Sequence, residues 1–567
     1  MTVPATTRFT GRRRPADRPV KADPRVPQAA ARLTEHYFRA MFDFGILSTA
    51  GADSFKHMLL GAAGGVVAFG LLLTYLYAGK YAMLAVGGSP ERYRLAVLGD
   101  DLFIVGLPML LAAFITLLVS DSLFPDERDF RILGPLPVRR TVVFAAKLRA
   151  LILFEGLLIA VVHLSLLPLV LLTSVGRFAE QSLLSRLIVW AITGAGASLF
   201  AVLAITAIVG GATLALSRSR LRELTGIVRS AMLGLLVLAM PFVLRLPHFG
   251  GAFVTRSTWL WFVPPAWFVG LQRSLHGHED MWSLQLAGTA IAAVASAAAV
   301  VATTYAILFR HFEQLVLRPI ATATSSPEPN RTRLPIRTTP AFRAVHRFVL
   351  LTIRRSQLHQ SVLVGILACG VGVFSPAGAA IWVPFGVMFV CALAVRGALV
   401  LPLEQRANWI FRLTEDGTTR REQLRAVDHV VTAFVVGLPV AASIPILWSA
   451  IGSRALVAGL VVALVGLVFV HAVLLDWRRI PFTCSYLPGK HFIAHSLLLG
   501  LFAYLVLTII GAGLVRSATT GALPAVLIVV SLSLTAIFLR RRRLAAWSET
   551  PLLFEDELPD QRQQLWL

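Results

Sequence analysis

The sequence predicts an all-α polytopic membrane protein with about twelve transmembrane helices arranged as two six-helix repeats. Of its 567 residues, 56% are hydrophobic and 15% are charged, and the mean hydropathy is +0.73. This composition excludes a water-soluble globular protein. Apolar runs of about twenty residues, the length that crosses a hydrocarbon core about 30 Å thick, follow one another along the chain. The order of spans and charged loops in the first half also recurs in the second.

The apolar runs divide into six expected spans on either side of a polar, Pro-rich linker. In the first half we expect them at 58–78, 102–122, 142–174, 187–216, 227–246 and 284–309. In the second half we expect them at 361–374, 377–401, 427–451, 456–475, 492–515 and 523–539. The halves match in layout rather than in residue identity, which indicates a tandem duplication.

Composition also suggests the domain boundaries. A basic N-terminal tail, 1–34, is too poor in apolar residues to order itself. The first six-span unit covers 35–318, the linker 319–341 and the second unit 342–543. An acidic tail, 544–567, follows the basic run that closes the last span.

The basic residues predict the orientation in the membrane. The net charge of +23 is concentrated in loops between apolar runs, where bases face the cytoplasm and anionic lipid, so a cell-membrane protein with both termini cytoplasmic is expected and nucleic acid is not. The second half obeys the positive-inside rule. The first half places six bases outside, namely Lys80, Arg92, Arg94, Arg245, Arg256 and Arg273.

A charged segment, FPDERDFRILGPLPVRRTVVFAAKLRA (124–150), separates the second and third spans. Acids lead into an apolar middle, a Gly-Pro-Leu-Pro break follows, and paired arginines open the next helix. Such an amphipathic element suits docking against another protein, and the alternative is an ordinary basic loop. EQRANWIFRLTEDGTTRREQLR (404–425) holds the same place in the second half, with Thr-Glu-Asp-Gly instead of the Pro-bracketed turn.

The stretch DERDFRILGPLPVRRTVVFAAKL (126–148) resembles the coupling segment of membrane permease subunits of type-2 ATP-binding-cassette (ABC) exporters. The resemblance implies two six-span units around a substrate path, driven by ABC ATPase subunits that bind ATP and Mg²⁺. It assigns the ATPase contacts to Asp126, Glu127, Arg128, Phe130, Leu133, Arg139 and Arg140, and by layout to Glu404, Arg406, Trp409, Arg420 and Arg421. The chain lacks the G-x-x-x-x-G-K-[ST] phosphate loop, so the nucleotide is expected on a separate subunit and this chain is expected to bind no cofactor itself.

The loop between the fifth and sixth spans reads STWLWFVPPAWFVGLQRSL. Its Pro-broken, amphipathic character predicts a segment in the outer leaflet, carried by Trp259, Trp261, Pro264, Pro265 and Trp267. In the resembled family, short helices at this position cap the exit. A plain interfacial aromatic belt is the alternative.

Ionisable residues near the spans are the remaining candidates. Glu155 is a candidate for the substrate path, with pairing to nearby bases at the span boundary as the alternative. We expect Asp100 and Asp101 to cap the second span at its outer end. The sequence LHGHEDMW (275–282) and three scattered cysteines predict no metal site, and no catalytic motif is present in the sequence.

Two other function classes stay open. A secondary transporter would also contain repeats, but it needs ionisable residues at mid-membrane, and those expected here lie mostly at span ends. A membrane enzyme acting on lipid-linked substrates would need an interfacial constellation, for which only the acids of 126–129 come close. The sequence leaves the substrate unknown.

Overall fold

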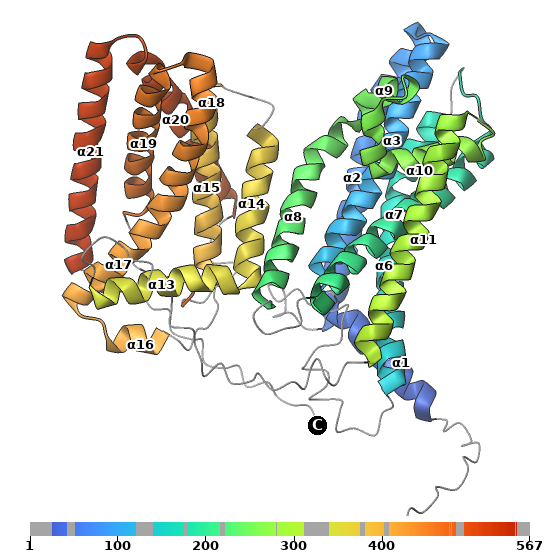
Figure 1. Cartoon of the computed structure of the whole chain (residues 1–567), viewed down its shortest axis with the longest axis horizontal. Helices are drawn as coiled ribbons and strands as arrows, with labels where there is room; N and C mark the ends of the chain where they lie inside the picture. The colour runs from blue at the N-terminus through green and yellow to red at the C-terminus, as the bar shows by residue number, and fades with distance from the viewer. Residues whose placement is uncertain are drawn as a thin grey trace, which may run out of the picture.

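The computed structural model is a multi-pass membrane protein built from helices (Figure 1). It describes residues 25–41, 52–120, 140–174, 178–215, 222–278, 280–310, 339–374, 380–401, 408–475, 477, 479–483, 493–549 and 551–552. Within these residues there are twelve helices long and apolar enough to cross a membrane, and no strand. The all-α polytopic fold with about twelve spans is therefore confirmed.

The first half forms one bundle. Its helices are α1 (Arg25–Ala40), α2 (Ala52–Gly87), α3 (Pro90–Leu118), α6 (Arg140–Ser174), α7 (Leu183–Ala215), α8 (Arg222–Arg245), η1 (Leu246–Phe249), α9 (Gly250–Val254), η2 (Thr258–Phe262), α10 (Pro264–Leu275) and α11 (Met281–Arg310). The spans are α2, α3, α6, α7, the run α8–η1–α9, and α11. Because α1 begins at Arg25, the expected boundary at residue 35 falls inside a helix.

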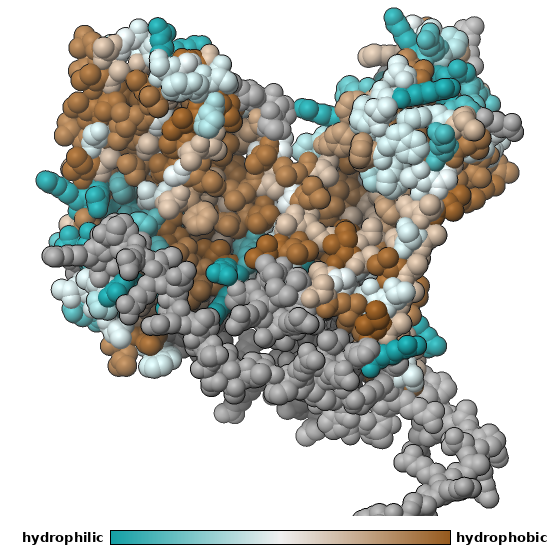
Figure 2. All heavy atoms as spheres, viewed as in Figure 1, coloured by the Kyte–Doolittle hydropathy of each residue, from teal (hydrophilic) through white to brown (hydrophobic). Residues whose placement is uncertain are grey.

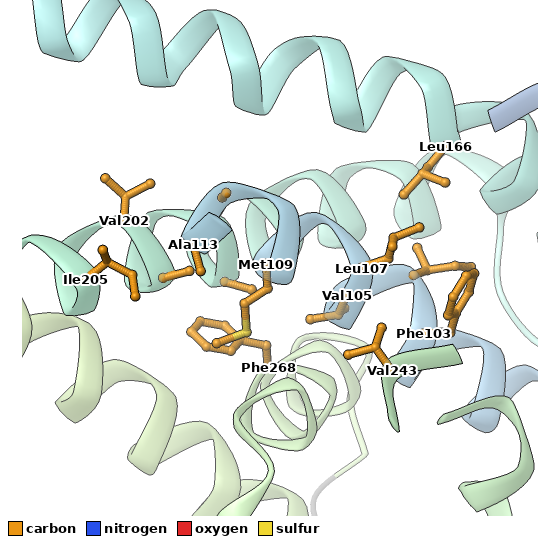
Figure 3. Packing of buried hydrophobic residues seen from close by; sticks show 14 of the residues in the cluster. Phe103, Val105, Leu107, Met109, Ala113, Leu166, Val202, Ile205, Val243 and Phe268 are labelled. Carbon is orange, nitrogen blue, oxygen red and sulfur yellow. The ribbon is translucent and has the colours of Figure 1, made fainter. Parts of the chain in front are cut away.

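Helix α3 is the centre of this bundle. It packs against α6, α7, α8, α9 and α10, and its residues from Leu98 to Met109 are all buried. Figure 3 shows side chains of α3, among them Phe103 and Met109, together with Val243 of α8 and Phe268 of α10. Gly99 permits a close approach of α3 to η1, since a Cβ there would clash with the Pro247 carbonyl oxygen. Close packing of this kind is the main source of helix association within a membrane.

The second half forms the other bundle. Its helices are α13 (Pro340–Arg355), α14 (Gln357–Phe374), α15 (Val383–Val400), α16 (Asn408–Leu413), α17 (Gly417–Thr432), the π-helix η5 (Ala433–Gly437), α18 (Leu438–Ile451), α19 (Arg454–Val473), α20 (Ile493–Ala518) and α21 (Ala522–Glu549). The spans are α14, α15, the run α17–η5–α18, α19, α20 and α21. Helix α21 continues past the expected boundary at residue 543.

Several helix contacts of the first bundle have a counterpart at the same span positions in the second. The amphipathic helix α1 packs on α6, the third span of the first half. Likewise, the amphipathic helix α13 packs on α17, which begins the third span of the second half. The second and fourth spans pack in both halves, as α3 with α7 and α15 with α19. The same is true of the fourth and sixth spans, α7 with α11 and α19 with α21. The first spans differ, because α2 packs on α6 whereas α14 packs on α8 and α15.

The contact between α8 and α14 is the main one between the halves, and Figure 1 shows these two helices between the bundles. Gly234 of α8 lies against Val364, and Gly372 of α14 lies against Pro241. The hydroxyl of Ser230 donates to the Gln360 side-chain oxygen at 3.3 Å. Figure 1 places α1, α13 and α16 at one end of the molecule and α9 and α10 toward the other. We call these the α13 end and the α10 end.

Candidate functional site

The short helix α16 lies outside the spans at the α13 end (Figure 1). It carries three large apolar side chains that are open to solvent, Trp409 (61% exposed), Ile410 (47%) and Leu413 (77%). Leu413 follows Trp409 by four positions and Ile410 by three, so it neighbours both of them on the helix surface. Exposed apolar groups on a helix outside the spans mark a surface suited to a partner protein. We call these three residues the α16 surface.

The turn after α16 is fixed by polar contacts. The Glu415 carboxylate accepts a hydrogen bond from Arg420 Nε at 2.9 Å and another from the backbone N–H of Leu552 at 2.7 Å. Asp416 begins α17 as its N-cap and accepts from the Thr418 hydroxyl at 2.8 Å. Because Asp416 is stabilised as a carboxylate by these bonds, chiefly the one from the Thr418 side chain, its pKa is lowered. These contacts fix the position of the α16 surface relative to α17.

The residues expected to contact the ATPase are only partly described. Asp126, Glu127, Arg128, Phe130, Leu133, Arg139, Glu404 and Arg406 lie outside the described residues, and Arg140 begins α6 with its side chain outside them. Trp409 lies on the α16 surface and Arg421 is exposed on α17. Arg420 instead contacts Glu415 within the chain. The expected set omitted Ile410 and Leu413, although their helical spacing from Trp409 was visible in the sequence.

A second group of polar side chains is buried inside the first bundle near the α10 end. Asp100 of α3 accepts from Lys80 Nζ and from the Tyr81 hydroxyl, each at 2.6 Å. The next residue, Asp101, accepts from Arg186 of α7 at 2.5 and 3.3 Å. Both acids lie inside α3, which Ser89 caps, so the expectation that they cap the span is wrong. Because both carboxylates are buried, the loss of a partner would leave a buried charge uncompensated.

Three of the six bases that the predicted orientation places outside are paired with acids. Lys80 is paired as described, and Arg94 contacts Glu180 at 2.8 Å. Arg273 contacts Asp280 at 3.5 Å. Three of the six exceptional bases are therefore neutralised by acids at the same end of the molecule.

A cavity of about 160 Å³ adjoins this network. Residues of α3, α7 and α10 and the stretch 178–181 line it, with Asp101 and Arg186 on its wall and His276 and His278 beside them. Burial, together with the nearby Arg186, lowers the pKa of His276 to about 4, so this imidazole is neutral at pH 7. Burial also lowers the pKa of His278. Among the described residues, no three His, Cys, Asp or Glu side chains gather as metal ligands would.

The three tryptophans of the aromatic segment expected in the outer leaflet are half-buried and pack against the core of the first bundle. Trp259 and Trp261 belong to η2, and Trp267 donates from its indole nitrogen to the Trp261 carbonyl at 2.9 Å. Pro264 and Pro265 start α10, where the missing N–H groups cost nothing. Helix α10 then packs among α3, α7 and α11 rather than lying along the surface.

Glu155 of α6 is buried, with 5% of its surface exposed. One carboxylate oxygen accepts from the Thr116 hydroxyl at 2.9 Å. The other has no hydrogen-bond partner within the described part of the chain. The structure therefore places Glu155 inside the first bundle, away from the boundary bases to which the sequence could have paired it.

The second bundle has a buried polar group of its own, at the α13 end. Arg543 of α21 is 2% exposed and donates to Asp428 at 2.9 Å and to His471 Nδ1 at 2.6 Å. Its guanidinium also lies over the Trp547 ring at 4.5 Å. This group joins α17, α19 and α21 to one another. In the sequence, Arg543 belongs to a run of consecutive arginines, and nothing in that run indicates that one of them is buried.

Comparisons with protein-family models, with curated proteins and with solved structures found no match for this chain.

Proposed function

We propose that this chain is the membrane-spanning permease of an ATP-driven exporter and that separate ABC ATPase subunits dock on its α13 end. The observation that carries the proposal is the α16 surface. It exposes three apolar side chains outside the spans, at the position in the second half where the resembled family has its coupling segment. An apolar patch at the centre of an interface supplies most of its binding free energy.

The helix packing supports a permease made of two similar units. Matched contacts link the amphipathic helices to the third spans, and the second spans to the fourth, in both halves. Figure 2 shows a hydrophobic surface over the middle of both bundles and a hollow between them that opens toward the α10 end. A path between two units that rock against each other requires this kind of separation.

The orientation belongs to the same proposal. The α13 end faces the cytoplasm, because the bases of α13, α17 and α21 lie there and basic loops remain inside. The ATPase subunits bind Mg²⁺ and ATP, and their closure moves the units through the α16 surface and the corresponding segment of the first half. The substrate is unknown, and transport is outward.

Copurification tests the proposal. The tagged full-length chain is isolated from its native membrane, alongside the double variant Trp409→Ser/Leu413→Ser. We expect a P-loop ATPase to accompany the wild type and to be depleted about 30-fold or more from the variant, since two central contacts are worth about 2 kcal/mol or more. Phe262→Ser is the matched control, because Phe262 is 86% exposed but lies near the α10 end. A wild-type preparation without any ATPase would contradict the proposal.

One observation favours a secondary transporter as a second candidate. Asp100, Asp101 and Glu155 lie inside spans, which corrects the expectation that ionisable groups lie mostly at span ends. Buried carboxylates of this kind carry protons or ions in gradient-driven transporters. Glu155→Gln keeps the shape and the hydrogen bond to Thr116. Under this candidate, the variant loses gradient-driven uptake into ATP-free vesicles, whereas under the exporter proposal such vesicles transport nothing with either residue.

A further inference from the structure

The cavity near the α10 end is lined by charged groups that already neutralise one another. Asp101 is bonded to Arg186 on its wall, and Arg94 is paired with Glu180 at its rim. Arg273, which also lines the cavity, is paired with Asp280. A ligand with a net charge would have to break one of these pairs, so the cavity suits an uncharged ligand.

The remaining hydrogen-bonding capacity belongs to three neutral atoms and to Nε of Arg186, which is also buried without a hydrogen-bond partner within the described residues. The side-chain oxygens of Gln272 and Gln181, and Nε2 of His276, are buried and have no hydrogen-bond partner within the described residues. Gln272 is only 2% exposed. Each of the two amide oxygens can accept a proton from a hydroxyl, and the neutral imidazole nitrogen can donate or accept according to its tautomer. Buried polar atoms without partners are costly, which indicates that a ligand or water satisfies them.

The walls and the volume narrow the ligand class. The rings of Tyr93 and Phe178 line the cavity with their centroids 6.0 Å apart, and flat aromatic faces pack against the C–H groups of a sugar or polyol. The cavity volume of about 160 Å³ is far above the roughly 10–15 Å³ that a single water needs on this measure. Such a cavity holds one sugar ring or a glycerol group.

We infer that the cavity formed by α3, α7, α10 and residues 178–181 binds an uncharged polyhydroxyl group, either a free saccharide or the headgroup of a glycolipid. Hydroxyls of the ligand donate to Gln272 and Gln181 and exchange a hydrogen bond with His276. The buried Asp101–Arg186 pair holds α3 and α7 at the spacing that the ring needs. This site does not depend on an ATPase partner, so it stands or falls separately from the transport mechanism.

Native mass spectrometry of the full-length chain tests the inference, in lauryldimethylamine oxide, a detergent without a sugar headgroup. The chain is titrated with methyl glucoside, with monoglucosyl diacylglycerol and with phosphatidylcholine. We expect saturable one-to-one binding of a glucosyl probe. Binding of methyl glucoside identifies a free saccharide site, and binding of the glycolipid alone identifies a headgroup site.

Three variants make the test specific. Gln272→Leu and Gln181→Leu each remove one acceptor and should weaken glucosyl binding about tenfold. Gln181 lies outside the spans, so its variant remains informative if Gln272→Leu fails to fold. Gln285→Leu is the matched control, because Gln285 is an exposed residue of α11 that does not line the cavity, and it should bind like the wild type. The inference is overturned if neither glucosyl probe saturates, if phosphatidylcholine competes equally, or if both cavity variants bind like the wild type.

Discussion

The two halves of the molecule place their buried charges at opposite ends. In the first half, Asp101 and Arg186 form a buried pair near the α10 end, beside a cavity. In the second half, Asp428 and Arg543 form one at the α13 end, where it joins α17 to α21. The two bundles therefore share several helix contacts but differ in where their buried ion pairs lie. The first pair lies beside the cavity, and the second holds together α17, which follows the α16 turn, and α21.

The two halves also differ in the connection between their fifth and sixth spans. Between the fifth and sixth spans, the first half inserts η2 and α10, which reach back into the bundle against α3. At the same place the second half has only the three residues Thr519, Thr520 and Gly521 between α20 and α21. Because α10 is buried, it brings Gln272 and Arg273 to the cavity. The second half has no helix between α20 and α21 that could contribute to a similar cavity.

The largest effect should follow from breaking the charge pair of the first half. Arg186→Met leaves the Asp101 carboxylate buried without its partner, and removing one member of a buried pair costs about 3–5 kcal/mol. We expect this loss in the free energy of unfolding, measured in mixed micelles. The control is Arg94→Ala in the exposed pair with Glu180, which should cost at most about 1 kcal/mol. Equal effects of the two variants would show that burial does not decide the energy.

The corresponding change in the second half should have a smaller effect. Arg543→Met removes the contact with Asp428, whose side chain is 20% exposed and can recover some hydration. The expected loss is about 2–3 kcal/mol in the same assay, and increased protease cleavage near the α16 turn should accompany it. A loss as large as that of Arg186→Met would remove the contrast between the two pairs.

The contact between the halves offers a third test. In Gly234→Leu, a larger side chain meets Val364 of α14, and overpacking typically costs about 1–3 kcal/mol. The bundles should separate before either one unfolds, so spin labels on α2 and α19 should report altered distances while helicity is unchanged. Gly64→Leu, at a glycine with open space around it, should leave those distances as in the wild type.

The smallest effect should come from pH at the α10 end. Because the folded-state pKa of His276 is lowered to about 4 while an unfolded histidine titrates near 6.5, the unfolded state binds the extra proton first. Stability should therefore fall as the pH drops from about 6.5 toward 4, and it should not change above 6.5. Burial lowers the pKa of His278 too, which adds to the same trend, whereas the lowered pKa of Asp280 contributes only as that acid is protonated at still lower pH. In His276→Gln the slope should decrease; an unchanged slope would assign it to other groups.

Much of the fold could be predicted from sequence because the signals were local. Runs of about twenty apolar residues report a span wherever they occur, and the alternation of acidic, apolar and basic residues near Trp409 reported a surface element. The position of Asp100 and Asp101 could not be read in this way. Two adjacent acids look like a helix cap, and only the arrival of Lys80 and Arg186 from other helices makes burial possible. The burial of Arg543 within a basic run depends likewise on Asp428, which lies far away in the sequence.

Of the three residues of the α16 surface, the sequence pointed only to Trp409, and the role of α10 could not be predicted. Trp409 was assigned to a partner contact because its segment holds the same place in the second half as the segment 124–150 holds in the first. Pro264 and Pro265 indicated a break in the chain, but nothing local showed that the helix after them turns into the bundle. Inward packing of α10 depends on small residues of α3, such as Gly106 against Pro265, which only the fold brings together.

Site-specific crosslinking at α16 tests the central claim most directly. The variant Leu413→Cys carries a short photoactivatable crosslinker in native membranes, and Phe262→Cys serves as the control near the α10 end. We expect an adduct with a P-loop ATPase from position 413 and none from position 262. An adduct at position 413 with lipid alone, or with proteins that lack a P-loop, would contradict the account.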